Sequence, residues 1–240
     1  MMLCKPRTAT GRYPRGEETK QRIIDVAIDI FGRQGFAGTS TRDIAACAKV
    51  NTPAIHYYFG GKLGLYNACI DRLTDGVWRR ISPAVLACQA SVDAGASLDG
   101  LVASLGEVQN SLIDSFFADR EGQAIRRLLA WEDAENGENT SEAFMKDRIG
   151  TPLFQTFQKV VERVAAAPMR RIDLELHALS LMGLSMIFHF NQTKVMDMLD
   201  RPALDDTLIA TLKAVARQQL SYALAGLAGS GHDLPAGGSA

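Results

Sequence analysis

Apolar residues recur along most of the chain at intervals of three and four, which is the period of an α-helix. Between residues 18 and 34 this period predicts one amphipathic helix. Its apolar stripe consists of Ile24, Ala27, Ile28 and Phe31. Gly35 follows at the position where helices commonly end in a left-handed residue. Because the alternating pattern of a half-buried strand is missing from the sequence, we expect an all-α fold.

Residues 40–62, STRDIAACAKVNTPAIHYYFGGK, predict two short helices joined by a tight turn. Ser40 stands where an N-cap is needed, and Asp43 follows at the spacing of a capping box, which satisfies two backbone donors reciprocally. Asn51 is the expected N-cap of the second helix, and Pro53 lies in its first turn, where a missing N–H costs nothing.

The two short helices have an apolar face and a polar face. The residues expected to point inward are Ile44, Ala45, Ala48, Ile55 and Phe59. The groups left on the other faces are Thr52, Ala54, His56 and Tyr57. A hairpin whose short second helix shows small polar and aromatic groups fits the geometry of a DNA major groove. The alternative is an ordinary helical hairpin inside a core, which would not be expected to expose these groups with Arg42 and Lys62 nearby.

The remainder of the chain also reads as helical. Helices are predicted over residues 62–86, 98–118, 121–132, 151–166, 172–199 and 202–227, with Pro83 at a bend and loops at 89–97 and 133–142. The two ends are polar or rich in Gly, Ser and Pro, and we expect them to be unfolded. The predicted organisation is a disordered basic arm (1–16), a three-helix helix-turn-helix domain (17–64), a larger helical domain (65–228) and a disordered tail (229–240).

Charge is unevenly distributed along the chain. The 240 residues carry a net charge of only −1. Residues 1–62 hold ten Lys or Arg against five Asp or Glu, a net of +5, and the rest of the chain has a net of −6. A basic head on an acidic body fits a DNA-binding module joined to a part that does not bind DNA. A basic disordered tail is the alternative, since four of the ten basic residues precede residue 16.

The sequence gives no indication of metal, redox or catalytic chemistry. The four cysteines are far apart and form no CxxC pair, and Cys47 and Cys69 are expected to be small apolar fillers. We expect no cofactor, no metal and no enzymatic activity, since only Glu132, Asp133 and His177 approach a catalytic grouping. The N-terminus lacks the apolar core of a signal peptide, and the apolar stretch at 178–190 is too short for a bilayer. We therefore expect a cytoplasmic protein without membrane contact.

Residues 19–70 resemble the TetR/AcrR family of bacterial transcriptional regulators. The matching motifs are Phe31 to Phe36, then Thr39, Ser40, Ile44 and Ala45, and then Val50, Ile55, His56, Tyr58, Phe59 and Lys62. His56 departs from the tyrosine usual at that place. The resemblance implies an all-α homodimer whose C-terminal ligand-binding and dimerisation domain takes a small molecule that changes DNA affinity. The helix running from His177 to Phe190 resembles the CecR-type subgroup more loosely.

Ten residues are expected to contact double-stranded DNA. They are Ser40, Thr41, Arg42, Thr52, Pro53, Ala54, His56, Tyr57, Tyr58 and Lys62. Arg42 has the fork that bonds guanine, although a phosphate contact or a surface salt bridge is equally open. Lys62 stands at a helix N-terminus, where a phosphate is the natural partner, and one of the two tyrosines is free to pack inward instead. The basic arm (Lys5, Arg7, Arg12 and Arg15) either reaches the minor groove or is solvated.

The larger domain is expected to hold an effector cavity and the dimer interface. The candidate ligand residues are Phe116, Phe117, Arg120, Arg127, Trp131, His177, Met182, Met186, His189 and Phe190, for which plain core is the alternative. The last two helices are expected to form a four-helix bundle with a second copy. Its apolar surface would come from Leu176, Leu179, Gly183, Leu184, Leu208, Leu212, Val215, Leu220 and Leu224, unless these are buried within one subunit.

These observations predict a ligand-responsive transcriptional regulator. We expect a repressor that a small apolar or aromatic effector, with one polar or anionic handle, releases from a palindromic operator with half-sites about 34–36 Å apart or more. The alternatives are an activator or a co-repressor-type regulator of the same fold, and a helical enzyme or scaffold whose hairpin does not bind DNA.

Overall fold

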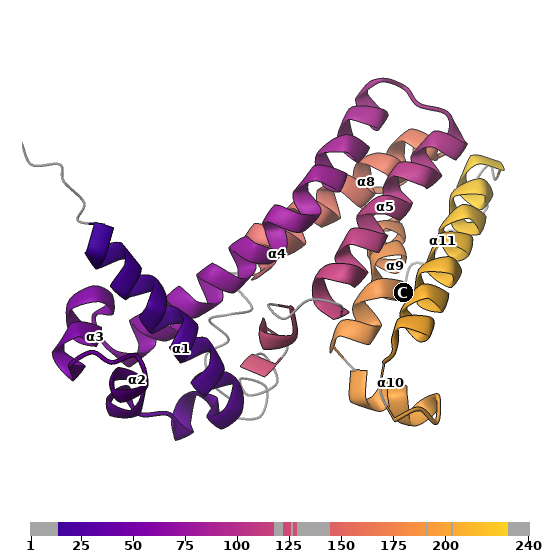
Figure 1. Ribbon diagram of the computed structural model, residues 1–240. Coiled ribbons are helices and arrows are strands. Elements are labelled where there is room, and N and C mark those ends of the chain that lie inside the picture. The colour runs from indigo at the N-terminus through magenta and orange to yellow at the C-terminus, as the bar shows by residue number, and fades with distance from the viewer. Residues whose placement is uncertain are drawn as a thin grey trace, which may run out of the picture. The chain divides into compact units, whose positions relative to one another are not determined.

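The computed structural model describes residues 14–117, 122–125, 127–128, 145–190, 192–202 and 204–229 (Figure 1). Within these residues the secondary structure is helical and contains no strand, which confirms the predicted all-α fold. The chain forms two compact units, Met1–Arg72 and Leu73–Ala240. The units divide between Arg72 and Leu73, inside one long helix that begins at Lys62, whereas the predicted domain boundary was residue 64, in the first turn of that helix.

The first unit contains α1 (Pro14–Gly38), α2 (Thr41–Cys47), α3 (Thr52–Phe59) and the beginning of α4 (Lys62–Asp93). Helix α1 begins at Pro14, so the prediction of an unfolded arm is wrong for residues 14–16. Proline is favoured at the first helical position, and Glu17 in the first turn complements the partial positive charge there. Residues 1–13 lie outside the described part of the chain.

Helix α1 changes direction at Gly35. This residue has φ 72° and ψ 175°, a conformation that favours glycine because no Cβ is present to clash. The chain then makes one more helical turn to Gly38. The Thr39 hydroxyl donates a buried hydrogen bond of 2.7 Å to the Gly35 carbonyl, an acceptor that needs a partner where the helix is interrupted. The predicted helix end is therefore a sharp change of direction.

The core of the first unit differs slightly from the predicted stripe. The fully buried side chains of α1 include Ile23, Ile24, Ala27, Ile30 and Phe31, whereas Ile28 is only half-buried. The ring centroids of Phe31 and Tyr66 lie 5.1 Å apart at 90°, and those of Phe36 and Tyr66 lie 5.2 Å apart. Edge-to-face contacts of this kind add to the stabilisation from apolar burial. Phe36 thus helps to close the small core.

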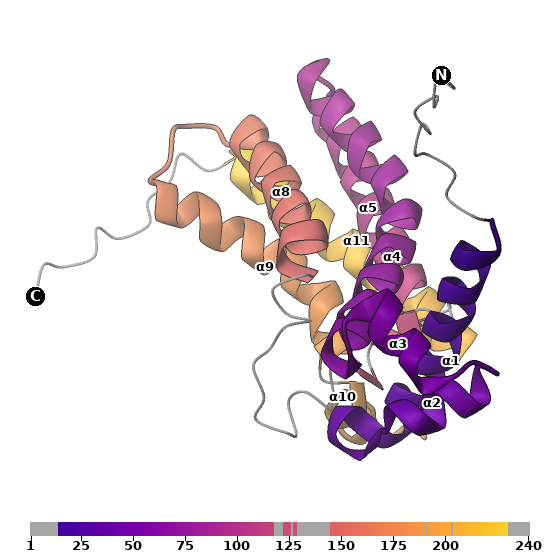
Figure 2. The same cartoon turned by 90° about the vertical axis from the view of Figure 1, so that its left-hand side faces the viewer.

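The second unit continues α4, and besides the short helical stretches at 122–125 and 127–128 the described residues add six helical segments. They are α5 (Leu98–Phe117), the π-helix η1 (Lys146–Gly150), α8 (Thr151–Val164), α9 (Arg171–Phe190), α10 (Gln192–Met198) and α11 (Asp206–Gly229). Figure 2 shows the connection between α8 and α9. The predicted continuous helix over 172–199 is wrong, because separate helices α9 and α10 occupy that range, and α11 begins four residues later than predicted. Most of the predicted helix at 121–132 and loop at 133–142 lies outside the described residues.

Helix α4 runs without a break through Pro83 to Asp93, so the predicted loop over residues 89–97 is wrong for residues 89–93, while residues 94–97 do connect α4 to α5. The buried stripe of Val77 and Ile81 continues on the far side of the proline as Val85 and Cys88. Continuous burial along one face keeps the helix intact, although the proline removes one backbone donor. Local breaker signals did not reveal this burial.

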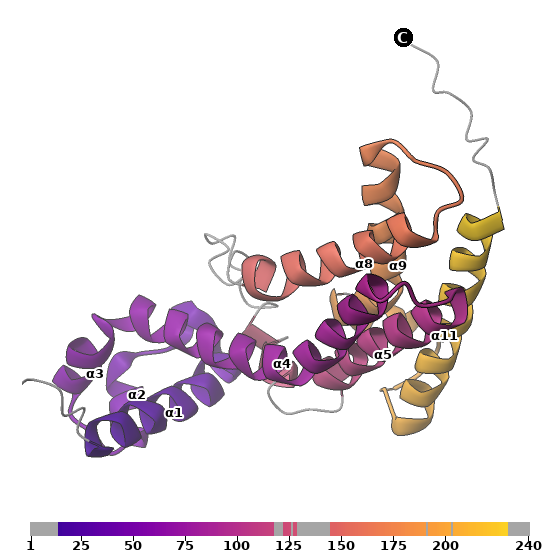
Figure 3. The same ribbon diagram turned by 90° about the horizontal axis from the view of Figure 1, so that it is seen from above.

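The second unit is a helical bundle in which α5, α8, α9 and α11 contact one another (Figure 3). Two side-chain amide groups, of which Gln109 is buried and Gln89 is half-buried, connect the helices. The Gln109 amide donates to the Leu181 carbonyl at 2.9 Å, and the Gln89 amide donates to the Thr156 hydroxyl at 2.8 Å. Buried polar groups need such partners, so these bonds fix the relative rotation of the helices. No helix in the described ranges is long and apolar enough to cross a membrane.

Candidate nucleic-acid interface

The first helix of the hairpin is capped by Ser40. The Ser40 hydroxyl accepts a hydrogen bond from the Asp43 backbone N–H at 3.1 Å, as the spacing predicted. The return bond differs from the prediction, because the hydroxyl itself donates to the Asp43 carboxylate at 2.7 Å. Aspartate is one methylene shorter than the glutamate of a full capping box, which explains why it engages the hydroxyl instead of the backbone.

The turn of the hairpin contains one left-handed residue and is stabilised by two side-chain hydrogen bonds. Lys49 adopts the left-handed region with φ 53°. The Asn51 side-chain oxygen accepts from the Ala54 N–H at 3.1 Å and so caps α3, as predicted. Arg22 of α1 donates from Nε to the Ala48 carbonyl at 3.0 Å. Sequence reasoning missed Arg22, because its partner is 26 residues away and no local pattern connects them.

Helix α3 has one buried anchor and an outward surface. Ile55 is completely buried, whereas Tyr57 is 83% exposed. The Tyr58 ring packs edge-on against Tyr57 with centroids 5.0 Å apart, and its hydroxyl lies beside Gly16 of α1. Of the two tyrosines, Tyr57 is therefore the one directed outward. Phe59, predicted to be inward, is half-buried.

The other predicted contact residues cluster around the helix starts. Arg42, in the first turn of α2, is exposed and has no hydrogen bond or ion pair within the described part of the chain. Ser40, Pro53 and His56 are also exposed. Thr41, Thr52 and Ala54 are half-buried. The arrangement leaves a free guanidinium and a small, mostly polar helix start at the surface, groups that suit the edges of bases.

Lys62 does not extend into solvent. Its ammonium group lies 3.4 Å from the Ala37 carbonyl and 4.4 Å from the centroid of the Phe36 ring. Both partners belong to the last turn of α1, whose carbonyls carry partial negative charge. The position of Lys62 in the sequence predicted a phosphate contact and did not predict these contacts within the protein. The predicted arm residues Lys5, Arg7 and Arg12 lie outside the described residues, as does the Arg15 side chain.

Of the three described cysteines, Cys69 and Cys88 are buried and Cys47 is exposed. Cys69 is fully buried and its thiol donates to the Ile24 carbonyl at 3.8 Å. Burial, with a smaller contribution from Asp25, raises the pKa of the Cys69 thiol far above its usual range. Cys69 is the apolar filler that its position predicted, but Cys47 is exposed at the end of α2, so that prediction is wrong for Cys47.

The structure describes the side chains of only four of the ten predicted effector residues. Phe117 and Met182 are buried, His177 is half-buried and Arg127 is exposed. Arg120 and Trp131 lie outside the described residues, and so do the side chains of Phe116, Met186, His189 and Phe190. The exposed position of Arg127 does not place it on the wall of an interior cavity.

The predicted dimer residues divide into two groups. Leu212, Leu220 and Leu224 are buried within the second unit, so the prediction that they face a partner is wrong. They lie on the side of α11 that packs against the rest of the bundle. Leu176 and Leu179 of α9 are about half exposed (54% and 51%), and Val215 of α11 is exposed too. These residues remain available to a second copy.

A capped hairpin with an outward second helix and a separate bundle define a helix-turn-helix protein with a helical C-terminal unit. Residues 23–69 match the model of bacterial regulatory proteins of the tetR family. Residues 101–227, more than half of the chain, match the C-terminal domain of the HTH-type transcriptional dual regulator CecR. The chain belongs to the TetR/AcrR family of transcriptional regulators, with a C-terminal domain of the CecR type.

Curated relatives match only a part of the chain. The chain is 42% identical over 69 residues to the dual regulator CecR of Shigella flexneri and 41% identical over 66 residues to the probable regulator YttP of Bacillus subtilis. It is 41% identical over 73 residues to the repressor Rv3405c of Mycobacterium tuberculosis. These matches cover 29%, 28% and 30% of this chain and 30%, 32% and 39% of the relatives. The chain thus spans about a third of the length of the relatives it matches.

Solved structures match the whole fold. A TetR-family regulator of Mesorhizobium loti has a TM-score of 0.59 at 19% identity, and the match covers 89% of this chain and 98% of that one. A TetR-like regulator of Rhodococcus sp. RHA1 has a TM-score of 0.57 at 22% identity, with 91% and 100% covered. At these identities the likeness establishes the fold alone.

Proposed function

We propose that the chain is a ligand-responsive repressor that binds a palindromic operator as a homodimer and leaves it when a small effector binds. The observation that carries the proposal is α3, which Asn51 caps and Ile55 anchors while Tyr57 stands 83% exposed. Such a helix, held rigidly and with polar groups outward, is suited to enter a major groove. The basic balance of residues 1–62 adds attraction to the phosphate backbone.

The proposed contacts fall into two kinds. Arg42, Thr52, Pro53, Ala54 and Tyr57 lie at the starts of α2 and α3 or on the outward side of α3, where base edges are within reach. The remaining proposed contacts position the protein on phosphates. They are Ser40, Thr41, His56, Tyr58 and Lys62. For Lys62, a phosphate contact requires its ammonium group to leave Phe36 and Ala37.

A second copy would dock against α9 and α11. Ile172, Leu176 and Leu179 recur on one side of α9, and all three are about half exposed. Val215 and Tyr222 are exposed on α11. Large apolar side chains in such number on two contacting helices favour an interface between subunits. A dyad between the copies would present two hairpins, so the operator would be a palindrome.

The effector is proposed to be mainly apolar or aromatic, because Phe117 and Met182 contribute buried apolar surface to the second unit. Release of DNA would require the effector to bind the DNA-free conformation more tightly than the DNA-bound one. Binding to chromosomal DNA implies that the protein works in the cytoplasm. The relative from Shigella flexneri is named a dual regulator, so activation is the second candidate, and reporter expression with and without the protein separates the two.

Selection from random duplex oligonucleotides tests the proposal directly. We expect enrichment of an inverted repeat, and a mobility shift on the recovered sequence that is stronger than on scrambled DNA. Metabolite fractions added to the shifted complex should include one that releases the DNA. Recovery of no preferred sequence, with or without metabolites, would contradict the proposed function.

A further inference from the structure

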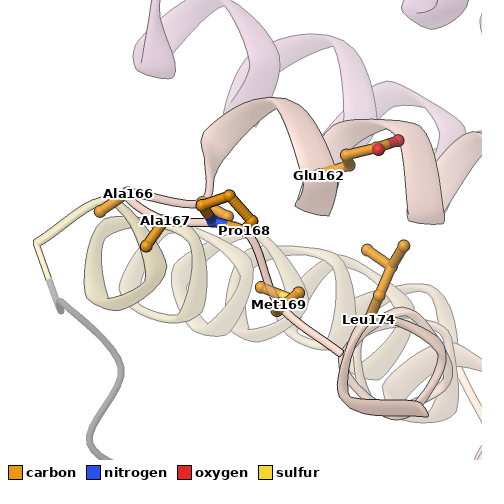
Figure 4. Close-up of a pocket in the computed structure, with 7 residues that line it drawn as sticks. Glu162, Ala166, Ala167, Pro168, Met169 and Leu174 are labelled. Carbon is orange, nitrogen blue, oxygen red and sulfur yellow. The ribbon is translucent and has the colours of Figure 1, made fainter. Parts of the chain in front are cut away.

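The corner between α8 and α9 contains a hollow of about 320 Å³ (Figure 4). Its wall includes Glu162 near the end of α8, the connecting residues Pro168 and Met169, and Leu174 in the first turns of α9. The remaining wall is formed by Ala165, Ala166 and Ala167. None of these residues was predicted as a ligand contact. The volume lies at the lower end of the range for small-molecule sites.

The wall of the hollow is apolar except for one acidic side chain. Met169, Leu174, Pro168 and the alanines contribute apolar surface, while Glu162 contributes the single charged group. In Figure 4 the Glu162 side chain and Leu174 project from α8 and α9 at the same corner. An apolar surface beside one carboxylate fits a molecule with an apolar body and a single positive charge.

The neighbouring cations do not neutralise Glu162. Arg170 forms two hydrogen bonds with the Asp173 carboxylate, at 2.7 and 2.9 Å, and Arg171 is paired with Glu175 at 2.7 Å. The guanidinium of Arg163 lies beside Gly95, at the end of α4. Among the described residues, Glu162 has no ion pair or hydrogen bond, even with Lys159 one turn earlier. The uncompensated charge at the hollow is therefore negative.

The hollow also lies where three helices meet. The Ala166 N–H, in its wall, donates to the Leu227 carbonyl near the end of α11 at 3.2 Å. A molecule in the hollow would contact α8, the connection and α9, and this hydrogen bond ties the connection to α11. Binding at this corner would therefore hold the three helix ends together and stabilise the second unit.

We propose that this hollow is a binding site for a small organic cation, an alkylammonium or arylammonium ion, with its apolar part against Met169 and Leu174 and its charge beside Glu162. The hollow contains neither Phe117 nor Met182, the residues to which the proposed function assigns its effector, and it adds a negative charge that those residues lack. Because binding is measured without DNA, its outcome is independent of whether the protein recognises an operator.

Titration calorimetry on the full chain tests the proposal with three probes of equal length, hexylammonium, hexan-1-ol and hexanoate. Because Glu162 is exposed and an exposed ion pair is screened by water, we expect hexylammonium to bind about threefold to fivefold more tightly than the other two and to raise the melting temperature. Glu162→Gln should reduce the affinity for hexylammonium to that of the alcohol. Leu174→Ala should weaken hexylammonium and hexan-1-ol alike. Asp197→Asn on α10 makes the same charge change on an exposed aspartate and serves as the control.

Three results would overturn the proposal. The first is the absence of any saturable heat with hexylammonium. The second is equal affinity for the cation and the alcohol. The third is hexylammonium binding that Glu162→Gln and Leu174→Ala leave unchanged, because the probe would then occupy another site. Circular dichroism of each variant verifies that the substitution has left the helices intact.

Discussion

The ammonium group of Lys62 lies 4.4 Å from the centroid of the Phe36 ring, so the first residue of α4 packs onto the last turn of α1. The Ala37 carbonyl, 3.4 Å away, is its second partner. The same charge that is proposed to meet a phosphate therefore also connects the two helices that flank the hairpin. DNA binding and the stability of the first unit are expected to share this residue.

Replacement of Lys62 by alanine is expected to have two effects. Affinity should fall equally for all DNA sequences, and the slope of log K against log salt should flatten by about one, as for one lost phosphate contact. The first unit should also lose about 0.5–1 kcal/mol of stability with the cation–π contact. Phe36→Leu is the matched control, because it removes the ring and keeps the charge. Phe36→Leu should keep the parent slope, and if Lys62→Ala keeps it too, Lys62 does not contact a phosphate.

Replacement of Arg42 by alanine should weaken binding to the operator more than to random DNA, by about 1–3 kcal/mol of discrimination. The reason is that its guanidinium is exposed in the first turn of α2 and is not engaged by the described residues. Arg33→Ala is the control, since Arg33 is also exposed but is paired with Asp29 at 2.5 Å. Competition binding on the two DNAs measures the difference. Equal losses on both would make Arg42 a phosphate contact.

Removal of the α3 cap should destabilise the hairpin. Asn51→Ala removes the oxygen that accepts the Ala54 N–H, and we expect a loss of about 0.5–2 kcal/mol in the free energy of unfolding. Asn51→Asp keeps an acceptor at that position and should retain most of the stability. Urea denaturation followed by circular dichroism measures both variants. If Asn51→Ala unfolds at the parent midpoint, the cap contributes nothing to the fold.

The buried cysteines should make stability fall at high pH. Burial raises the pKa of the Cys69 thiol, and it raises that of Cys88 as well, although the Ser104 hydrogen bond partly opposes this. An unfolded thiol ionises above about pH 8.5, while the folded thiols stay protonated. The unfolded state then binds fewer protons, so the free energy of unfolding should decrease as pH rises above about 8.5 and stay unaffected by these groups below it. Cys69→Ala should reduce this decline in denaturation experiments between pH 7 and 10.

Thiol labelling gives an independent check of the same burial. In the folded protein with Cys4 replaced by serine, we expect the exposed Cys47 to react quickly with a thiol reagent at pH 8. Cys69 and Cys88 are buried and should react only after unfolding. Rapid labelling of three thiols in the native protein would show that the cores around α4 open readily.

Charges on the exposed face of α9 should prevent dimerisation. The double substitution Leu176→Asp and Leu179→Asp places two like charges on side chains that are about half exposed in one chain. We expect the variant to sediment as a monomer and to bind the operator weakly. Leu86→Asp on α4 is the control, because Leu86 is 61% exposed and lies on neither α9 nor α11. If the variant remains a dimer, the interface does not include this face of α9.

The hairpin could be predicted because its signals are local. Ser40 and Asn51 cap helices through bonds to residues three positions away, so their spacing in the sequence is also their geometry. Gly35 marks the end of the regular helix because its φ of 72° favours a residue without a side chain. The family resemblance, carried by the same segment, was confirmed by both family models.

Long-range contacts account for most of the errors. Pro83 indicates a bend, yet α4 continues because Val85 and Cys88 remain buried beyond it. The leucines of α11 have the same chemistry on both faces, and only packing against α5, α8 and α9 decides which of them are inside the subunit. Neither result follows from periodicity, which locates a stripe but not the surface that it meets.

The sequence by itself therefore determined the all-α class, the capped hairpin and its family, since these depend on interactions between residues close together in the chain. Only the tertiary structure placed Lys62 on Phe36, tied Arg22 to Ala48, and left Glu162 beside an apolar hollow without a partner among the described residues. Each of these depends on which distant segments meet. Which segments meet is decided by the total apolar surface that the helices bury together. The free energy of burial is non-directional, so no local pattern specifies the partner of a given segment.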